Sequence, residues 1–166
     1  LGPAFAPSLS AQRRRAPVTL RVNAARLARD DAAAFLSDEG IGTVPHPLSD
    51  TALTVTSGAP RIKTSAAYLD GLVELQDAAS QAAAALVPIR DGDRVLDYCA
   101  GGGGKTLALA ARVPRARFFA HDADAARMRD LPPRARRAGC QVTLLDGPAI
   151  VRQAPFTPRA ASDARY

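Results

Sequence analysis

Alternation of apolar and polar residues in the first half of the chain predicts a small α+β unit. Residues 18–22 and 53–56 alternate with the period of two that is typical of strands with one buried face. Between them, residues 30–39 repeat their apolar positions as an amphipathic helix does, and Gly40 ends the pattern. We therefore expect a small α+β domain over residues 17–70.

The apolar pattern of the second half predicts a parallel α/β sheet. A helix is expected over residues 72–87, because Pro88 cannot continue it. Beyond it the chain runs strand, helix, strand, helix and strand, and right-handed crossovers then require parallel strands with helices on their faces. The second of these helices, over residues 123–138, is expected in two pieces because two adjacent prolines interrupt it. Residues 71–146 are therefore interpreted as an incomplete Rossmann-like domain.

Both ends of the chain lack such a pattern. Residues 1–16 are rich in Pro, Ala and Ser, which is typical of a linker, and Leu1 is not a methionine, so we expect a piece of a longer protein. Residues 147–166 are expected to be an unstructured tail, because they show no apolar period. A lost reading frame or a truncated gene is one hypothesis for this tail.

A run of four glycines, Gly101 to Gly104, joins the apolar strand over residues 94–97 directly to a helix. Such a junction is typical of a cofactor site. Glycines lack Cβ atoms and let a ligand lie against bare backbone, while the free N–H groups of the following helix point at the same place. The spacing of the loop then decides between cofactors.

Three glycine-loop patterns compete at this junction. A phosphate-binding Walker loop would need a glycine at Cys99, and a dinucleotide fingerprint would need one at Thr106 or Leu107. Rossmann-like methyltransferases instead have an acidic residue at the strand end, then small residues with glycines two apart. Asp97 and the loop after it fit this third pattern, with Cys99 for the first glycine. S-adenosylmethionine carries no phosphate, so the loop would serve close approach to its methionine and ribose parts.

Two later strands also end in a carboxylate. Asp122 follows the apolar run over residues 117–121, and Asp146 ends the run over residues 140–145. Because ligands in this fold class lie at the carboxyl ends of the strands, Asp122 is the candidate for the ribose and Asp146 the candidate for the adenine. Each carboxylate alone is equally well explained as a turn or helix cap. Together with the glycine loop they favour a cofactor cleft.

Two signatures in this region resemble one protein family. Gln-Asp-Ala-Ala-Ser-Gln at residues 76–81 and Val-Leu-Asp-Tyr-Cys-Ala-Gly-Gly-Gly-Gly-Lys-Thr at residues 95–106 are similar to segments of the Sun/Fmu family of bacterial ribosomal RNA (cytosine-5) methyltransferases. The resemblance covers residues 17–146, with residues 17–70 as an RNA-side domain. It implies S-adenosylmethionine as cofactor and RNA, most simply ribosomal RNA, as partner. The cofactor residues that it implies are Cys99, Ala100, Gly101, Gly102, Gly103, Gly104, Lys105, Asp122 and Asp146.

The chain departs from that family's pattern at its cysteines. By the resemblance, a thiolate from a Thr-Cys motif attacks cytosine and a Pro-Cys motif assists release. The only cysteines here are Cys99 and Cys140, preceded by Tyr98 and Gly139, so we assign no catalytic residue. Two hypotheses stay open. One is an RNA (cytosine-5) methyltransferase whose catalytic half is missing from this chain, and the other is a noncatalytic RNA-binding or cofactor-binding remnant.

The charge of the chain is compatible with an RNA partner. The formal net charge is +6, and nearly all the positive side chains are arginines, whose guanidinium groups suit phosphates and stacked bases. A biased genome composition explains the charge equally well. One group of arginines is interpreted either as an RNA-facing patch or, more simply, as a solvated helix face. This group is Arg127, Arg129, Arg134, Arg136 and Arg137.

Length and composition set the remaining limits. At 166 residues and 47% hydrophobic composition, the chain suits one medium domain or two small ones. Two cysteines, no apolar run of membrane length and no signal peptide predict a cytoplasmic protein without a membrane association. No metal site is expected, because His46 and His121 stand far apart in the sequence and alone.

Overall fold

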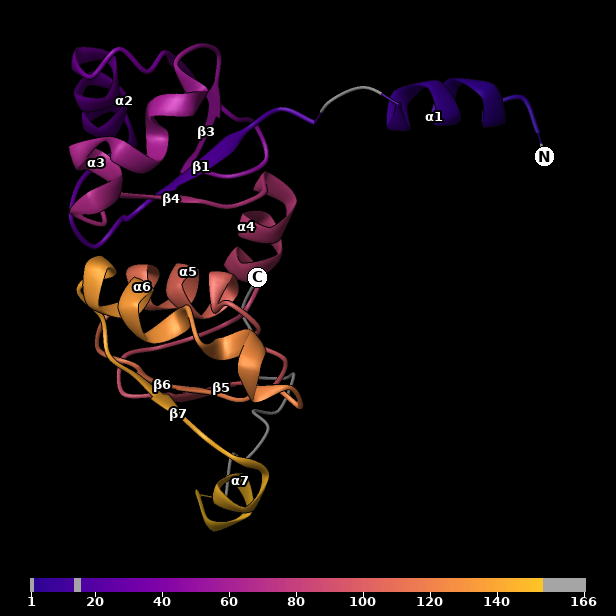
Figure 1. Ribbon diagram of the computed structural model, residues 1–166. Helices are drawn as coiled ribbons and strands as arrows, with labels where there is room; N and C mark the ends of the chain where they lie inside the picture. Colours follow the sequence, from indigo (N-terminus) through magenta and orange to yellow (C-terminus); the bar gives the residue numbers. More distant parts are fainter. Residues whose placement is uncertain (1, 14–15, 154–166) are drawn as a thin grey trace.

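The computed structural model describes residues 2–13 and 16–153 of the chain. In that part of the chain two units stack on one another, with an antiparallel sheet in the first and a parallel sheet in the second (Figure 1). Helix α1 (Phe5–Gln12) projects away from the first unit and buries no residue. None of the described helices is long and apolar enough to cross a membrane.

The first unit is the small α+β fold that the alternation predicts. Its strands pair antiparallel in the order β2-β3-β1-β4, with β1 (Thr19–Val22), β2 (Thr43–Pro45), β3 (Ala52–Val55) and β4 (Val73–Leu75). Apolar side chains of the sheet pack against α2 (Arg29–Asp38), the 3-10 helix η1 (Ala59–Thr64) and α3 (Ala66–Leu69). The core residues are Leu20, Val22, Ala32, Leu36, Ile41, Leu53, Ile62, Ala67 and Val73.

The single helix predicted over residues 72–87 is wrong at its start. Residues 73–75 pair with β1 as strand β4, and helix α4 (Ala78–Ala85) begins only after Asp77. The Asp77 carboxylate accepts hydrogen bonds from two backbone N–H groups of the first turn, so it fixes the helix start there. β4 therefore belongs to the antiparallel sheet, and the boundary between the units lies after this strand rather than at residue 71.

Strand β1 is buried on both faces, although its alternation predicts one exposed face. Leu20 and Val22 lie in the core of the first unit. The alternate residues Thr19, Arg21 and Asn23 are also buried, and Arg21 is only 3% exposed. Arg21 and Asn23 donate hydrogen bonds to carbonyls of the second unit. The polar face of this sheet is therefore an internal junction between the two units.

The second unit confirms the predicted parallel sheet. Strands β5 (Arg94–Asp97), β6 (Arg117–Ala120) and β7 (Val142–Leu144) pair in that order, and all the pairings are parallel. Helices α5 (Gly104–Arg112) and α6 (Leu131–Ala138) lie on the sheet face that is turned toward the first unit (Figure 1). The expected break in the second crossover is present, because the 3-10 helix η2 (Ala125–Met128) precedes α6. The two prolines lie in the first turn of α6, where no helical N–H is lost.

Both ends of the chain contain helices where the sequence predicts none. Helix α1 lies within the expected linker at residues 1–16, and α7 (Gly147–Gln153) occupies the start of the expected unstructured tail. Asp146 accepts a hydrogen bond from the N–H of Ala149 at 2.6 Å, which caps the first turn of α7. The rest of the expected tail, residues 154–166, lies outside the described residues.

Candidate cofactor site

The glycine loop leads from β5 into α5 through two left-handed backbone positions. Gly101 has φ of 51° and Gly103 has φ of 78°, a region that residues with a Cβ rarely adopt. The N–H of Gly103 donates to the carbonyl of Ala100 at 2.8 Å, which closes the turn. Gly103 is also the N-cap of α5, so the free N–H groups of that helix start at the loop.

Asp122 contacts the glycine loop directly. Its Oδ2 atom accepts a hydrogen bond from the N–H of Gly101 at 2.9 Å, and its Oδ1 atom accepts one from the N–H of Asp124 at 3.1 Å. The exposed guanidinium of Arg127 lies 3.3 Å from Oδ2. The structure thus brings together two of the predicted cofactor elements, the loop and the acid after the second parallel strand.

Backbone hydrogen bonds hold the pKa of Asp122 below its usual value of 3.8. The N–H of Asp124 is the largest cause, the N–H of Gly101 and the charge of Arg127 act in the same direction, and burial opposes them. Because the pKa is lowered on folding, the ionised carboxylate stabilises the fold at every pH above its unfolded pKa. This contribution is lost as the pH falls through the lower pKa of the folded state.

This lowered pKa predicts how the stability of an Asp122→Asn variant depends on pH. The variant should melt at a lower temperature than wild type at pH 7, because the amide oxygen of asparagine can accept only one of these two hydrogen bonds and carries no charge. The difference in Tm should stay constant down to about pH 5 and shrink below about pH 4. Thermal unfolding followed by circular dichroism between pH 7 and pH 3 measures this. A difference in Tm that grows on acidification would contradict the lowered pKa of Asp122.

A polar contact between the end of strand β5 and the first turn of α5 fixes the two ends of the loop. The hydroxyl of Thr106, on the first turn of α5, donates to Oδ2 of Asp97 at 2.7 Å. Across the neighbouring strand end, His121 is buried, and its Nδ1 atom lies 3.0 Å from the carbonyl oxygen of Leu145. The exposed ring of Tyr98 lies against that imidazole, with ring centroids 4.9 Å apart. These contacts hold the carboxyl edge of the sheet in register with the loop.

The remaining predicted residues differ in how they lie. Cys99 and Lys105 are exposed at the two ends of the loop, and Ala100 donates its N–H to the carbonyl of His121 at 2.9 Å. Asp146 is exposed and caps α7, and its described partners are on that helix rather than on the loop. The cap therefore accounts for Asp146 as it lies here, and its contact with adenine stays a prediction.

Sequence reasoning missed the side chains that hold the loop from behind. Arg21 on β1 donates to the carbonyl of Gly104 at 2.7 Å, and Nη1 of Arg134 on α6 donates to the carbonyl of Gly102. Arg21 lies more than 80 positions from the loop, so no local pattern marks it. A signal existed for Gln76, because it belongs to the 76–81 signature. Its side-chain oxygen accepts a hydrogen bond from Arg21.

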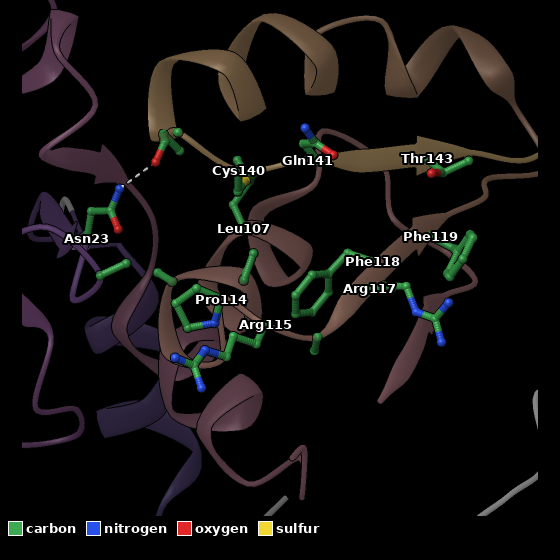
Figure 2. A pocket seen from close by; sticks show the side chains of 16 residues that line it. Asn23, Leu107, Pro114, Arg115, Arg117, Phe118, Phe119, Cys140, Gln141 and Thr143 are labelled. Carbon is green, nitrogen blue, oxygen red and sulfur yellow. Dashed lines mark hydrogen bonds between the residues drawn. The ribbon is translucent and has the colours of Figure 1, made fainter. Parts of the chain in front are cut away.

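A cavity of about 500 Å³ lies away from this loop, at the amino ends of β6 and β7 (Figure 2). Its lining includes Leu107, Phe118 and Cys140, and it contains none of the residues predicted to bind the cofactor. Burial raises the pKa of the Cys140 thiol. In residues 2–13 and 16–153, no three His, Cys, Asp or Glu side chains gather where they could hold a metal ion.

Comparison with known proteins identifies the family. Residues 5–61 match the model of the ferredoxin-like domain of RsmF/B-like methyltransferases. The chain is 32% identical to the ribosomal RNA small subunit methyltransferase B of Citrobacter koseri. This match extends over 139 residues, which are 84% of this chain. This chain belongs to the Sun/Fmu family.

Solved structures agree with a Sun/Fmu fold. The crystal structure of PH0851 matches with a TM-score of 0.80 and 26% identity, over 87% of this chain and 33% of that protein. A methyltransferase homolog protein from Pyrococcus horikoshii matches with a TM-score of 0.75 and 26% identity, over 82% of this chain and 45% of that protein. This Sun/Fmu chain spans only 32% of the length of the Citrobacter relative.

Proposed function

We propose that this chain carries the cofactor-binding part of an S-adenosylmethionine-dependent RNA (cytosine-5) methyltransferase that acts on ribosomal RNA. The observation that carries the proposal is the hydrogen bond between Asp122 and the N–H of Gly101, because it joins the glycine loop to a strand-end carboxylate at the carboxyl edge of the parallel sheet. The relatives named as ribosomal RNA methyltransferases supply the substrate class.

The donors and acceptors around Asp122 fit the ribose of that cofactor. A carboxylate offers about four acceptor positions, and backbone N–H groups take one on each oxygen. Arg127 approaches both oxygens with a single Nη1 atom, and its side chain is 63% exposed. Because this side chain is largely exposed, its guanidinium can turn into solvent and yield these positions to two hydroxyl donors.

The loop itself fits the methionine end of the cofactor. S-adenosylmethionine would supply an electrophilic methyl group bound to its sulfonium sulfur. The chain's part is to bind and orient this group, and a loop of four glycines lets a ligand reach the backbone N–H groups at the start of α5. Lys105, exposed just after the loop, is the proposed partner of the ligand's carboxylate. RNA, in the cytoplasm, is the proposed partner of the assembled protein.

A second candidate is a noncatalytic cofactor-binding or RNA-binding chain. The positions of the two cysteines favour it. Cys140 precedes β7, at the sheet end opposite to the glycine loop, and burial raises the pKa of its thiol, which makes it a poor nucleophile. Cys99 lies in the loop, where the cofactor itself would lie. Transfer of a labelled methyl group to ribosomal RNA by the purified chain would exclude this candidate.

Calorimetric titration with S-adenosylmethionine tests the cofactor assignment. We expect wild type to bind and Asp122→Ala to bind at least about tenfold more weakly, because charge-assisted hydrogen bonds to the ribose are lost. Asp124→Ala is the matched control. That carboxylate lies two residues away and caps η2 through the N–H of Ala126, so its loss should leave the affinity nearly unchanged.

Two outcomes would contradict the assignment. One is a folded wild-type chain that shows no binding. The other is equal weakening by the Asp122 and Asp124 substitutions, since only Asp122 contacts the loop.

A further inference from the structure

A buried polar cluster joins the first unit to the glycine loop. At its centre are Arg21 on β1 and Glu74 on β4, which are directly paired across the antiparallel sheet. Arg21 is 3% exposed and Glu74 is 7% exposed. The cluster lies on the sheet face that is turned toward α5 and α6, so its contacts cross from one unit to the other.

Two arginines of this cluster hold carbonyl oxygens of the glycine loop. Arg21 donates through Nη1 to the carbonyl of Gly104 at 2.7 Å. Arg134 donates through Nη1 to the carbonyl of Gly102. The two contacted carbonyls flank Gly103, the residue with φ of 78° that begins α5. Both sides of the left-handed turn are therefore fixed by a guanidinium.

Both arginines are in turn held by residues of β4 or just after it. The side-chain oxygen of Gln76 accepts a hydrogen bond from Arg21. Oε2 of Glu74 accepts one from Nε of Arg134 at 3.2 Å and one from Nη2 of Arg137 at 2.7 Å. The guanidinium of Arg137 also lies over the ring of Tyr68 in the first unit, 4.2 Å from its centroid.

We infer that the antiparallel unit sets the shape of the glycine loop, with Glu74 and Gln76 as positioning residues that act through Arg134 and Arg21. Four consecutive glycines have more backbone freedom than any other tetrapeptide, so a ligand would otherwise have to order them on binding. Loop carbonyls that are already held remove part of this entropic cost and raise the affinity.

The charges of the cluster make Glu74 its critical member. Arg134 and Arg137 both bind the single carboxylate of Glu74. Its charge also acts on Arg21, its direct partner across the sheet. Burial lowers the pKa of Arg21 to about 10, and the charge of Glu74 opposes this shift. Arg21 therefore stays charged at neutral pH. Without the carboxylate, the cationic groups would repel one another and release Arg134 from its place.

Hydrogen exchange of the full chain without ligand tests this inference. In Glu74→Gln, the N–H groups of Gly101 and Gly103, which are both hydrogen-bonded in the loop, should exchange about tenfold faster, as expected for the loss of charged hydrogen bonds. The N–H of Leu145, bonded to the carbonyl of Ala120 in the parallel sheet, is the internal reference and should not change.

The matched control is Glu39→Gln, because Glu39 is the other glutamate of the chain. Its carboxylate accepts hydrogen bonds from the N–H groups of Ala66 and Ala67 in the first unit and has no described contact with the loop. This control should leave exchange at Gly101 and Gly103 as in wild type. If Glu74→Gln does not fold, Arg134→Lys decides instead, since lysine keeps the charge but cannot bind Glu74 and Gly102 through one fork.

Two results would overturn the inference. One is unchanged loop exchange in a folded Glu74→Gln or Arg134→Lys variant. The other is equal acceleration at Gly103 and Leu145, which would mean general destabilisation.

A second titration, with S-adenosylmethionine, should show about tenfold weaker binding in Glu74→Gln. This part rests on the proposed function. If wild type fails to bind while loop exchange responds as expected, the proposed function is wrong and the positioning role stands.

Discussion

Replacement of Gly71 by alanine should destabilise the chain by about 2–4 kcal/mol and separate its two units. Gly71 has φ of +71°, and an added Cβ would lie 2.0 Å from the carbonyl oxygen of Arg137 at the end of α6. This oxygen is backbone and cannot rotate away. The separation would also stretch the hydrogen bond that Asn23 donates across the units to the carbonyl of Ala138 at 2.9 Å. Urea unfolding at pH 7 measures the loss.

Gly139→Ala is the matched control for this prediction. Gly139 lies at the end of the same helix with φ of +75°, but nothing lies within 4 Å of its added Cβ. This variant should lose only about 1 kcal/mol through backbone strain. A second readout is hydrogen exchange of the side-chain amide of Asn23, whose protection should fall in Gly71→Ala and not in the control. Equal losses in the two variants would show that the Gly71 turn does not bind the units together.

The parallel sheet and its loop could be predicted because their signals are local. Each strand ends in an acid or glycine within a few residues, and crossover handedness then fixes the topology. The 72–75 segment could not be predicted in the same way. Its apolar residues continue into an alanine-rich helix, and only the pairing of β4 with β1, some 50 positions away, makes it a strand. A tertiary partner decided the local structure there.

The role of the arginines on α6 could not be predicted from the local sequence either. Their spacing suggests either an RNA-facing patch or a solvated face, but Arg134 and Arg137 are each only 20% exposed and bind Glu74. Their partner comes from the other unit, so no sequence pattern near residues 131–138 predicts this contact. The Gln76 signature gave the one local hint, because it couples the small unit to the loop.

A substitution in the glycine loop should also have a large effect. Gly103→Ala should weaken binding of S-adenosylmethionine by about a hundredfold and destabilise the chain by about 3 kcal/mol. Gly103 has φ of +78°, and an added Cβ would lie 2.2 Å from Cδ1 of Leu131. Leu131 is the first residue of α6, and its side chain is fully buried in the core, so it cannot swing aside. A displaced α6 would carry Arg134 away from the carbonyl of Gly102. Calorimetric titration and urea unfolding measure the two losses.

Two further variants separate the clash from backbone strain. Gly92→Ala also places alanine at positive φ, +83°, but with open space around its Cβ, so it should cost about 1 kcal/mol and leave the affinity unchanged. Leu131→Ala removes the atoms that the new Cβ would strike. If the clash is the cause, Gly103→Ala combined with Leu131→Ala should lose less stability than the sum of the two single variants. Strict additivity would mean that the left-handed backbone alone requires glycine at this position, and that α6 does not transmit the substitution to the loop.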